Sequence, residues 1–545
     1  MPYKTVNPEA YHPIIYIRGY AMNESDIDET TADPFCGFNV GSTVYRARPS
    51  PTPPARFVFE SPIMRLVSDH GYANVISQGT DLTSASYTGT LSRRSIVVHH
   101  YYDQASSLLG DGQTPPIQTF AADLAALIHR MIDHVLVGDN VGPNGYKSKD
   151  DFRCYLVAHS MGGLVARTFL QGTPAGFDVK LRDRVLKLFT YATPHNGIDI
   201  LGFNVPAFLK PHGINTFDRA VMAQYLNLKY DPQSTDVHKN SVAWMPKSCM
   251  EARQIFTLIG TNRQDYEVAL GLSRTFVGKG SDGLVRIQNA DLTGFDETGK
   301  DPDEPCAKAF AFRSHSGFFG IVNSEEGYQN LQRFLFGNYR VDVWLDVNNV
   351  TLPAGSLANA DARLASDPLG TLDASYPVEL LVSLRNNSWY LTRRVAVEDS
   401  AAVVEHHDLR DAQRKPTMVS KLLSTIFMAD WAKIDPNSDT VAYRLQLGVL
   451  MPDFQINKAD ASDSHYEGSK IFSGAAVIEL TTNKPQWTAT YYWESDSPGS
   501  ALPPKIWPLG LSPDKNGKLV GTIPVSSGGA VRLNAQIRFI VTPWK

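Results

Sequence analysis

Residues 153–170 read RCYLVAHSMGGLVARTFL and combine a strand, a tight turn and a helix. A short apolar run rich in strand formers leads directly into the turn Ala158–Gly163. Apolar residues then recur at helical spacing until Gly172 and Pro174, which are typical of a helix end. This pattern predicts that Ser160 lies on a nucleophile elbow, the sharp strand-to-helix turn that requires small neighbouring residues.

An elbow would give two residues a chemical role. Ser160 would present its hydroxyl at the carboxyl end of the strand, where a nucleophile is exposed. The amide of Met161 would lie at a helix N-terminus, which favours a developing oxyanion. A serine that only satisfies a turn is the alternative, but the strand before it and the helix after it favour the nucleophile.

Length and composition exclude several classes of protein. A chain of 545 residues is too long for one ordinary core, and 43% hydrophobic with 20% charged residues is typical of soluble globular proteins. The formal net charge of −5 is small for this length, so it favours neither nucleic acid nor an anionic membrane as a partner. Four cysteines do not make a disulfide framework in so long a chain.

No targeting segment is visible in the sequence. Residues 1–19 lack the charged start and apolar run of a secretory signal. No stretch reaches the roughly 18 apolar residues that span a bilayer. These observations favour a cytoplasmic protein, with signal-independent secretion left open.

Residues 1–337 alternate strand and helix signals, which predicts an α/β domain with a mostly parallel sheet and helices on both faces. Catalytic groups in such sheets lie on loops at the carboxyl ends of the strands. Helices are expected from Ser61 to Gly71, from Phe120 to Val135 and from Ser324 to Phe336. Strands are expected at 14–17, 95–102, 154–157, 185–191, 254–259 and 307–312.

Between about 198 and 250 this alternation is interrupted by an apolar insertion. Its helix-like part places Phe217, Val221 and Tyr225 on one face, with Thr216 as a candidate cap. Two interpretations stay open: a lid over an apolar substrate pocket, or an extra helical layer packed against the core.

Residues 338–545 predict a separate β-rich domain with the form of a sandwich, because short alternating or apolar runs are separated by turn sequences. Asn348-Asn349 is one of the expected turns. An amphipathic helix is indicated only near 417–431.

A serine nucleophile requires a general base and an orienting acid. In elbow-type hydrolases the chain order is serine, acid, histidine. Asp282 in KGSDGLVR and His315 in FRSHSG fit this order and follow strands, so we expect them to complete the catalytic group with Ser160. Asp265 is the second choice for the acid, and Asp199 is a further alternative.

Two other histidines lie near these motifs. His195 in TPHNG precedes the acid, which excludes it as the base in this order. His159 directly precedes Ser160. Both are expected to line the substrate pocket. The second oxyanion donor should follow the strand that ends at Ile17, and the amide of Tyr20 is the candidate, because Gly19 allows the backbone to turn into the site.

These motifs resemble the α/β-hydrolase superfamily, and within it the bacterial lipase-like and esterase-like branch. AHSMGG is similar to the elbow of some small bacterial lipases, and SDGLV and SHSG resemble the acid and histidine loops. TPHNG is similar to a segment that many lipases carry after the next strand. The RGY near the start looks like the oxyanion segment, but Arg18 stands where a histidine is usual, which weakens the assignment of Tyr20. The resemblance covers residues 10 to about 335.

The resemblance implies an α/β-hydrolase fold and a serine hydrolase of carboxylic esters, with a small-molecule or lipid ester, including phospholipid, as substrate. An acyltransferase or peptidase on the same fold and a non-catalytic binding protein are the alternatives. No metal or organic cofactor is expected, because the acidic loops 24–33 and 296–304 lack the glycine and spacing of an EF-hand loop. Peripheral contact with a lipid surface and the oligomeric state stay open.

Overall fold

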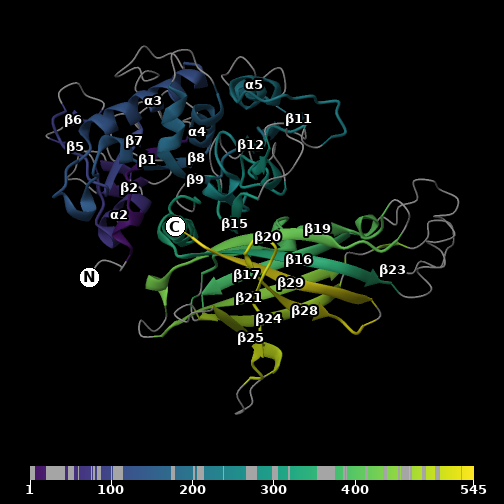
Figure 1. Ribbon diagram of the computed structural model, residues 1–545. Helices are drawn as coiled ribbons and strands as arrows, with labels where there is room; N and C mark the ends of the chain where they lie inside the picture. The colour runs from purple at the N-terminus through teal and green to yellow at the C-terminus, as the bar shows by residue number, and fades with distance from the viewer. Residues whose placement is uncertain are drawn as a thin grey trace. The chain divides into compact units, whose positions relative to one another are not determined.

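The computed structural model divides into two compact units, Met1–Phe336 and Gly337–Lys545 (Figure 1). It describes residues 6–19, 43–46, 55–58, 61–74, 76–77, 80–82, 87–99, 101, 115–172, 178–200, 203–204, 214–236, 239–265, 279–296, 305–316, 320–352, 375–384, 387, 389–411, 415–433, 438–451, 454–455, 465–466, 469–481, 487–496, 504–529 and 531–544.

The first unit is built on a parallel sheet, which for the described residues has seven strands. The elbow strand β8 and its neighbour β1 lie in its interior, which explains why both are buried throughout and mainly apolar. In sheet order the strands are β15 (Ala307–Ala311), β13 (Ile255–Gly260), β9 (Val185–Tyr191), β8 (Cys154–His159), β1 (Ile14–Ile17), β7 (Ser95–His99) and β4 (Ala73–Asn74).

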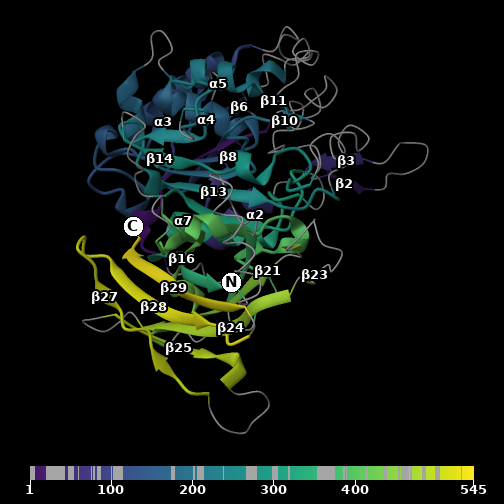
Figure 2. The same ribbon diagram turned by 90° about the vertical axis from the view of Figure 1, so that its right-hand side faces the viewer.

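Helices cover both faces of this sheet (Figures 1 and 2). Successive strand residues point to opposite faces. Thus Leu188 joins the core shared with α3 (Ile117–His134) and α4 (Met161–Gln171). The next residue, Phe189, packs its ring 5.9 Å from that of Phe334 on α7 (Glu325–Phe336). Helix α2 (Ser61–His70) packs against α7. The predicted α/β class with a mostly parallel sheet is confirmed.

The described part of the insertion is packed into the first unit. Helix α5 (Arg219–Tyr225) follows a 3₁₀ turn, Ile214–Phe217, and both contribute side chains to the α3/α4 core. Asp218, not Thr216, caps α5, because its carboxylate accepts hydrogen bonds from the amides of Ala220 and Val221. Residues 201–202 and 205–213 lie outside the described residues. Short strand pairs also occur, namely β10 (Asp199–Ile200) with β11 (Phe203–Asn204) and β12 (Trp244–Pro246) with β14 (Thr293–Phe295).

The second unit is β-rich, as predicted. Two antiparallel sheets share one apolar core, which is the arrangement of a sandwich. The first contains β20 (Val419–Met428), β16 (Tyr339–Thr351), β29 (Arg532–Pro543), β28 (Leu519–Ser526) and β27 (Ser512–Pro513). The second contains β18 (Thr392–Arg394), β17 (Ser375–Leu384), β21 (Thr440–Met451), β24 (Ser469–Thr481), β25 (Thr488–Trp493) and β26 (Trp507–Pro508), with β19 (Ala402–Glu405) paired to β17.

Two local predictions in this unit are wrong. The stretch expected to be an amphipathic helix forms strand β20, because it pairs with β16 along its length and tertiary pairing overrides helical spacing. Asn348-Asn349 does not turn the chain. Strand β16 runs through both residues, and a shift of register between Val347 and Asn349 marks a β-bulge that absorbs the extra residue.

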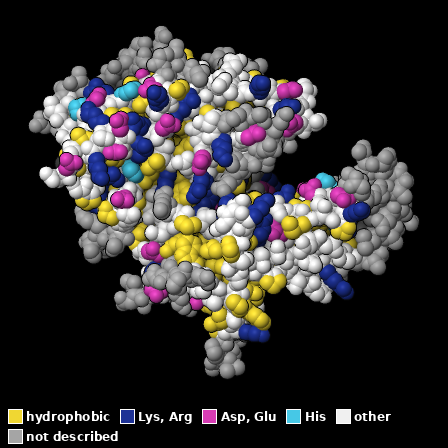
Figure 3. All heavy atoms as spheres, in the orientation of Figure 1, with side chains coloured by type: hydrophobic (Ala, Val, Ile, Leu, Met, Phe, Trp, Pro, Cys, Tyr) yellow, Lys and Arg dark blue, Asp and Glu magenta, His cyan; other side chains and the backbone are white. Residues whose placement is uncertain are grey.

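The surface of the first unit carries mixed charges. Figure 3 shows basic and acidic side chains interspersed over the face in view, in agreement with the small net charge. Within the described ranges, the helices lack the combination of length and apolarity that a membrane span requires.

A buried lysine caps the end of α7. Lys187 is 4% exposed, and its ammonium donates hydrogen bonds to the carbonyls of Phe334 (3.2 Å) and Leu335 (2.8 Å). Carbonyls in the last turn of a helix have no partner within the helix and attract a cation. Burial nevertheless disfavours the charge and lowers the pKa of Lys187 to about 7.

This buried lysine predicts a pH-dependent stability. Between about pH 7 and pH 10.5 the unfolded chain holds a proton on Lys187 that the folded chain lacks, so folding becomes more favourable as pH rises. Relative to Lys187→Met, the free energy of unfolding of the wild type should rise by about 1 kcal/mol per pH unit between pH 8 and 10. Urea unfolding of both proteins across this range measures the difference. A difference that does not change with pH would contradict the burial argument.

Candidate active site

Ser160 lies on a strained turn between β8 and α4. Its φ of 51° and ψ of −125° place a non-glycine residue in a backbone region that L-residues rarely adopt. Its amide donates to the carbonyl of Tyr191 at the end of β9, at 2.9 Å. This contact from the neighbouring strand holds the strained residue in place, as the elbow geometry requires.

Two glycines bring α4 against the ends of the adjacent strands. A Cβ on Gly162 would lie 2.2 Å from the carbonyl oxygen of Arg18 and 2.5 Å from that of Ile17. A Cβ on Gly163 would lie 2.1 Å from the hydroxyl oxygen of Thr193. The small residues of AHSMGG are therefore required by the close approach of the helix to two loops.

The structure brings the three predicted residues Ser160, Asp282 and His315 into one hydrogen-bonded row. The Nδ1 atom of His315 is 2.8 Å from Oδ2 of Asp282, and its Nε2 atom is 2.9 Å from the hydroxyl oxygen of Ser160. A carboxylate can only accept, so Nδ1 carries the proton and Nε2 is left to accept from the serine hydroxyl. All three side chains are buried to more than nine-tenths. This arrangement allows the imidazole to take the hydroxyl proton.

The carboxylate of Asp282 is held on its other side by its own loop. Its Oδ1 atom accepts from the amides of Leu284 (3.0 Å) and Val285 (2.8 Å). Its carbonyl accepts from the amide of His315 at 2.9 Å. A Cβ on Gly260, at the end of β13, would lie 2.8 Å from Cβ of Asp282, so the strand end lies directly against Asp282. One carboxylate oxygen is thus fixed by backbone, and the other is left for His315.

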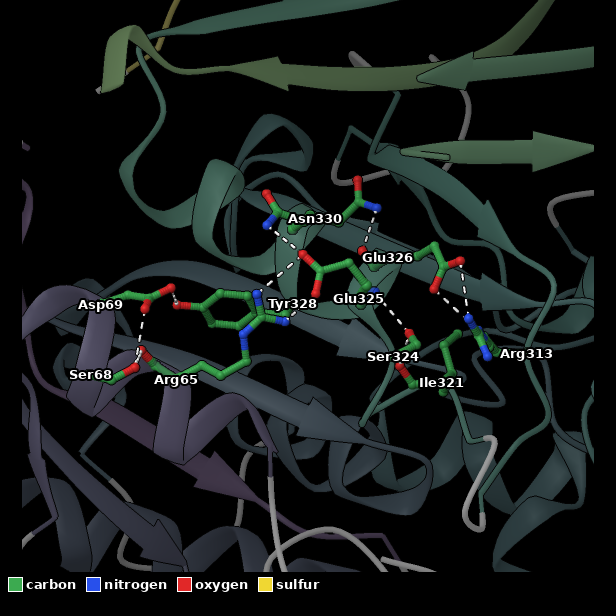
Figure 4. A network of polar contacts seen from close by, with 12 residues as sticks. Arg65, Ser68, Asp69, Arg313, Ile321, Ser324, Glu325, Glu326, Tyr328 and Asn330 are labelled. Atoms are coloured by element: carbon green, nitrogen blue, oxygen red, sulfur yellow. Dashed lines mark hydrogen bonds and ion pairs between the residues drawn. The ribbon is translucent and has the colours of Figure 1, made fainter. Parts of the chain in front are cut away.

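The loop that carries His315 is braced from both sides. His159 donates from Nε2 to the carbonyl of His315 at 2.9 Å, and the two rings lie 5.0 Å apart. Figure 4 shows the other brace, in which Arg313 binds Glu326 of α7 through two contacts of 3.1 and 3.3 Å. Ser324 accepts from the amide of Gly327 and so caps α7 just after the loop.

A second set of contacts in Figure 4 joins α7 to α2. Arg65 binds Glu325 at 2.6 Å and lies over the ring of Tyr328, 3.7 Å from its centroid. The hydroxyl of Tyr328 donates to Asp69 at 2.9 Å. These contacts fix α7, and hence the end of the histidine loop.

The alternative acids lie in other contacts. Asp265 accepts from the side chain of Asn262 at 2.6 Å. Asp199 binds Arg219 and Asn289. These contacts join the two carboxylates to other side chains, whereas Asp282 contacts His315, which favours Asp282 as the orienting acid.

His195 is completely buried behind the elbow. Its Nε2 atom is 3.1 Å from the hydroxyl of Thr190, and burial together with the nearby Arg167 holds its pKa well below the usual range. This makes it a neutral interior group. Contact of His159 or His195 with substrate stays a prediction.

Arg167 is a structural residue that the sequence analysis missed. It is fully buried on α4 and donates to the carbonyls of His195 (2.9 Å), Val242 (2.8 Å) and Trp244 (2.9 Å). These bonds join the elbow helix to the TPHNG segment and to the insertion. Burial lowers its pKa to about 10, which leaves it charged at neutral pH. The available signal was that Arg167 is the one charged residue of α4.

Of the two residues expected to bind the oxyanion, the structure describes Met161 but not Tyr20. Met161 is the first residue of α4, so its amide belongs to the first turn, whose N–H groups have no partner within the helix. Tyr20 lies outside the described residues. The residue before it is close to the nucleophile, since a Cβ on Gly19 would lie 3.1 Å from Cβ of Ser160.

Metal ligands do not gather in the parts of the chain that the structure describes: no group of three or more His, Cys, Asp or Glu residues there is suited to hold an ion. The acidic loop 24–33 lies outside the described residues, and of the loop 296–304 only Asp296 is described.

Comparison with known proteins finds solved structures of low similarity, including the following two. The chain is similar to phospholipase PlaB from Legionella pneumophila, with a TM-score of 0.30 and 12% identity over 85% of this chain and 90% of that chain. It is also similar to the lin2722 gene product of Listeria innocua, with a TM-score of 0.26 and 12% identity over 60% of this chain and 94% of that chain. No protein-family model and no curated protein matches. Scores this low carry no argument about activity.

The close approach at the elbow predicts the effect of a single added methyl group. Gly162→Ala would force a side chain into two backbone carbonyls, so we expect a loss of roughly 3 kcal/mol in stability and displacement of Ser160. Gly528→Ala is the matched control, because a Cβ there would meet nothing within 4 Å. Urea unfolding measures both. Equal stability of the two variants would show that α4 can move away from the strand ends.

Proposed function

We propose that this protein is a serine hydrolase of carboxylic esters that acts through an acyl-enzyme, on lipid or other apolar esters. The observation that supports it is the row of Ser160, His315 and Asp282, joined by contacts of 2.9 and 2.8 Å at the carboxyl edge of a parallel sheet. A turn serine without a catalytic role would require neither a base at this distance nor an acid behind the base.

In the first half of the reaction, His315 takes the proton from Ser160 while the serine oxygen attacks the ester carbonyl. Asp282 holds the imidazole in the tautomer that accepts at Nε2 and stabilises its cationic form. His315 then returns the proton to the leaving alcohol. In the second half, the same imidazole activates water, which cleaves the acyl-enzyme and releases the acid and Ser160.

The amides of Met161 and Tyr20 are proposed to bind the oxyanion that forms on the carbonyl oxygen. A helix N-terminus offers a donor and a favourable dipole at Met161. For Tyr20 the support is the position of Gly19 beside Ser160. Removal of one such donor usually costs about 100- to 1,000-fold in rate.

The insertion is proposed to form part of an apolar substrate site. Helix α5 contributes Met222 and Tyr225 to the core, and Arg167 donates to the carbonyls of Val242 and Trp244. Peripheral contact with a lipid surface is part of the same proposal.

Two other functions use the same fold. An acyltransferase or a peptidase would retain the row and differ only in the acceptor or the leaving group. Product analysis with water, an added alcohol and amide substrates in competition separates them. A non-catalytic binding protein is disfavoured, because all three groups are present at hydrogen-bond distance.

The proposed roles predict how much ester hydrolysis three variants lose. Ser160→Ala and His315→Ala should reduce ester hydrolysis by about 10⁴-fold or more, and Asp282→Asn by about 10⁴-fold, because the amide favours the wrong imidazole tautomer. A fluorophosphonate probe should label the wild type and fail to label Ser160→Ala. An unlabelled wild type, or equal labelling of Ser160→Ala, favours the binding protein instead.

The proposed substrate class predicts a dependence on acyl-chain length. We expect hydrolysis rates to rise from acetate to longer acyl esters, including phospholipids, because the site is proposed to be apolar. Rates for a graded series, measured below and above micelle formation with Ser160→Ala as the background, test this. A rate increase at the interface would support a moving cover. A profile that favours the shortest chains would instead identify an esterase of small substrates.

A further inference from the structure

Four polar side chains join segments that are distant in sequence, and we call them the polar hub: Asn196, Asp199, Arg219 and Asn289. One guanidinium nitrogen of Arg219 lies 2.9 and 3.0 Å from the two carboxylate oxygens of Asp199. Asn289 donates from its side chain to the same carboxylate at 2.8 Å. Arg219 also donates from Nε to the carbonyl of Asn196 at 2.9 Å. The hub therefore joins the TPHNG segment, α5 and the loop of the acid.

The hub is buried, so its contacts carry weight. Asp199 is 6% exposed and Asn289 is 1% exposed. A carboxylate with so little access to water is costly unless a cation compensates it. Arg219 is that cation, with a side-chain exposure of 17%. Loss of Arg219 would leave the charge of Asp199 supported mainly by the neutral Asn289.

Asn289 connects the hub to the loop that carries Asp282. This loop, residues 280–289, is closed on itself, because the amide of Ile287 donates to the carbonyl of Gly280 at 2.9 Å. Inside it, the amide of Asp282 donates to the carbonyl of Val285 at 3.1 Å. The carbonyl of Asn289 accepts from the amide of Asn196 at 2.9 Å. The hub therefore holds the end of the compact loop that carries Asp282.

The other side of the hub is connected to the insertion. Arg219 is the first residue of α5, whose Met222 and Tyr225 belong to the core. The side-chain oxygen of Asn196 accepts from the hydroxyl of Ser241 (3.1 Å) and the amide of Val242 (3.0 Å). The insertion is thereby anchored to the hub at two places, at Arg219 and at residues 241–242.

We propose that the insertion is a positioning element for the acid: Arg219 acts through Asp199 and Asn289 to hold the loop of Asp282 at the distance that His315 requires. This inference rests on the proposed ester hydrolase function. The hub residues do not touch the reacting atoms, so they are positioning residues and not catalytic residues. The insertion would then support catalysis through Arg219 on α5, whichever part of the insertion contacts substrate.

The test compares Arg219→Met with Arg538→Met in the full-length chain. Arg538 also compensates a buried carboxylate, that of Asp346, which is 1% exposed and 2.7 Å away, but it lies in the second unit. Both variants leave a buried charge without its arginine and should lower stability. Only Arg219→Met should lower kcat for ester hydrolysis, by about tenfold with little change in KM, because a misplaced acid impairs the chemical step more than substrate binding.

The pH profile separates positioning from general destabilisation. His315 is faced by the carboxylate of Asp282, the hydroxyl of Ser160 and the ring of His159. A weakened contact with the carboxylate stabilises the protonated imidazole less, so the acid limb of the kcat/KM profile of Arg219→Met should move to lower pH. Arg219→Lys should recover part of both effects, because it keeps the charge. Asn289→Ser shortens the side chain that binds Asp199, so it should shift the pH profile in the same direction by a smaller amount. It replaces Arg219→Met in the test if that variant does not fold.

Three results overturn the proposal. The first is a wild-type kcat and pH profile in Arg219→Met or, if that variant does not fold, in Asn289→Ser. The second is an equal change in Arg538→Met, which would show that loss of stability alone lowers the rate. The third is a wild type that neither hydrolyses esters nor reacts with a fluorophosphonate, which would remove the proposed function itself and is visible before any hub variant is measured.

Discussion

The close approach of α4 to the ends of two neighbouring strands is the constraint on which the site depends. Gly162 leaves no room for a Cβ beside the carbonyls of Ile17 and Arg18, and Gly163 leaves none beside Thr193. A helix that starts this close to the sheet forces Ser160 into its positive φ. The strain is sustained because the sheet on one side and the buried helix on the other fix the backbone. The hydroxyl is thereby presented at the sheet edge, where two later loops can reach it.

Those loops are held by polar contacts and not by apolar packing alone. The carboxylate of Asp282 is bound by backbone amides of its own turn, and the loop of His315 is braced by His159 and by the pair of Arg313 and Glu326. Arg167 and the polar hub add connections between the elbow helix, the TPHNG segment and the insertion. Buried polar groups need specific partners, so they favour one arrangement of the loops. Apolar contacts of similar energy are less directional and would favour it less strongly.

The sequence predicted features that depend on short motifs and on chain order. The elbow is one continuous stretch, and the order of serine, acid and histidine selected Asp282 and His315, which the structure places in one row with Ser160. Features that depend on distant partners were not predictable in this way. Strand β20 has helical spacing but pairs with β16, and Asn348 forms a bulge because both flanking segments remain in the ladder. The hub links residues that are 20 to 93 positions apart, and no local pattern reports such a link.

The lysine beneath α7 has a consequence for preparing the first unit by itself. The last turn of α7 is held by Lys187, and the ring of Phe336 packs 5.2 Å from that of Tyr11 and 4.6 Å from that of His70. A truncation that stops within this turn would remove the carbonyls that Lys187 binds and leave its amine without these acceptors in an apolar interior. A fragment that contains the first unit alone should therefore include Phe336, so that the chain is cut after the last residue of α7 that packs in the core.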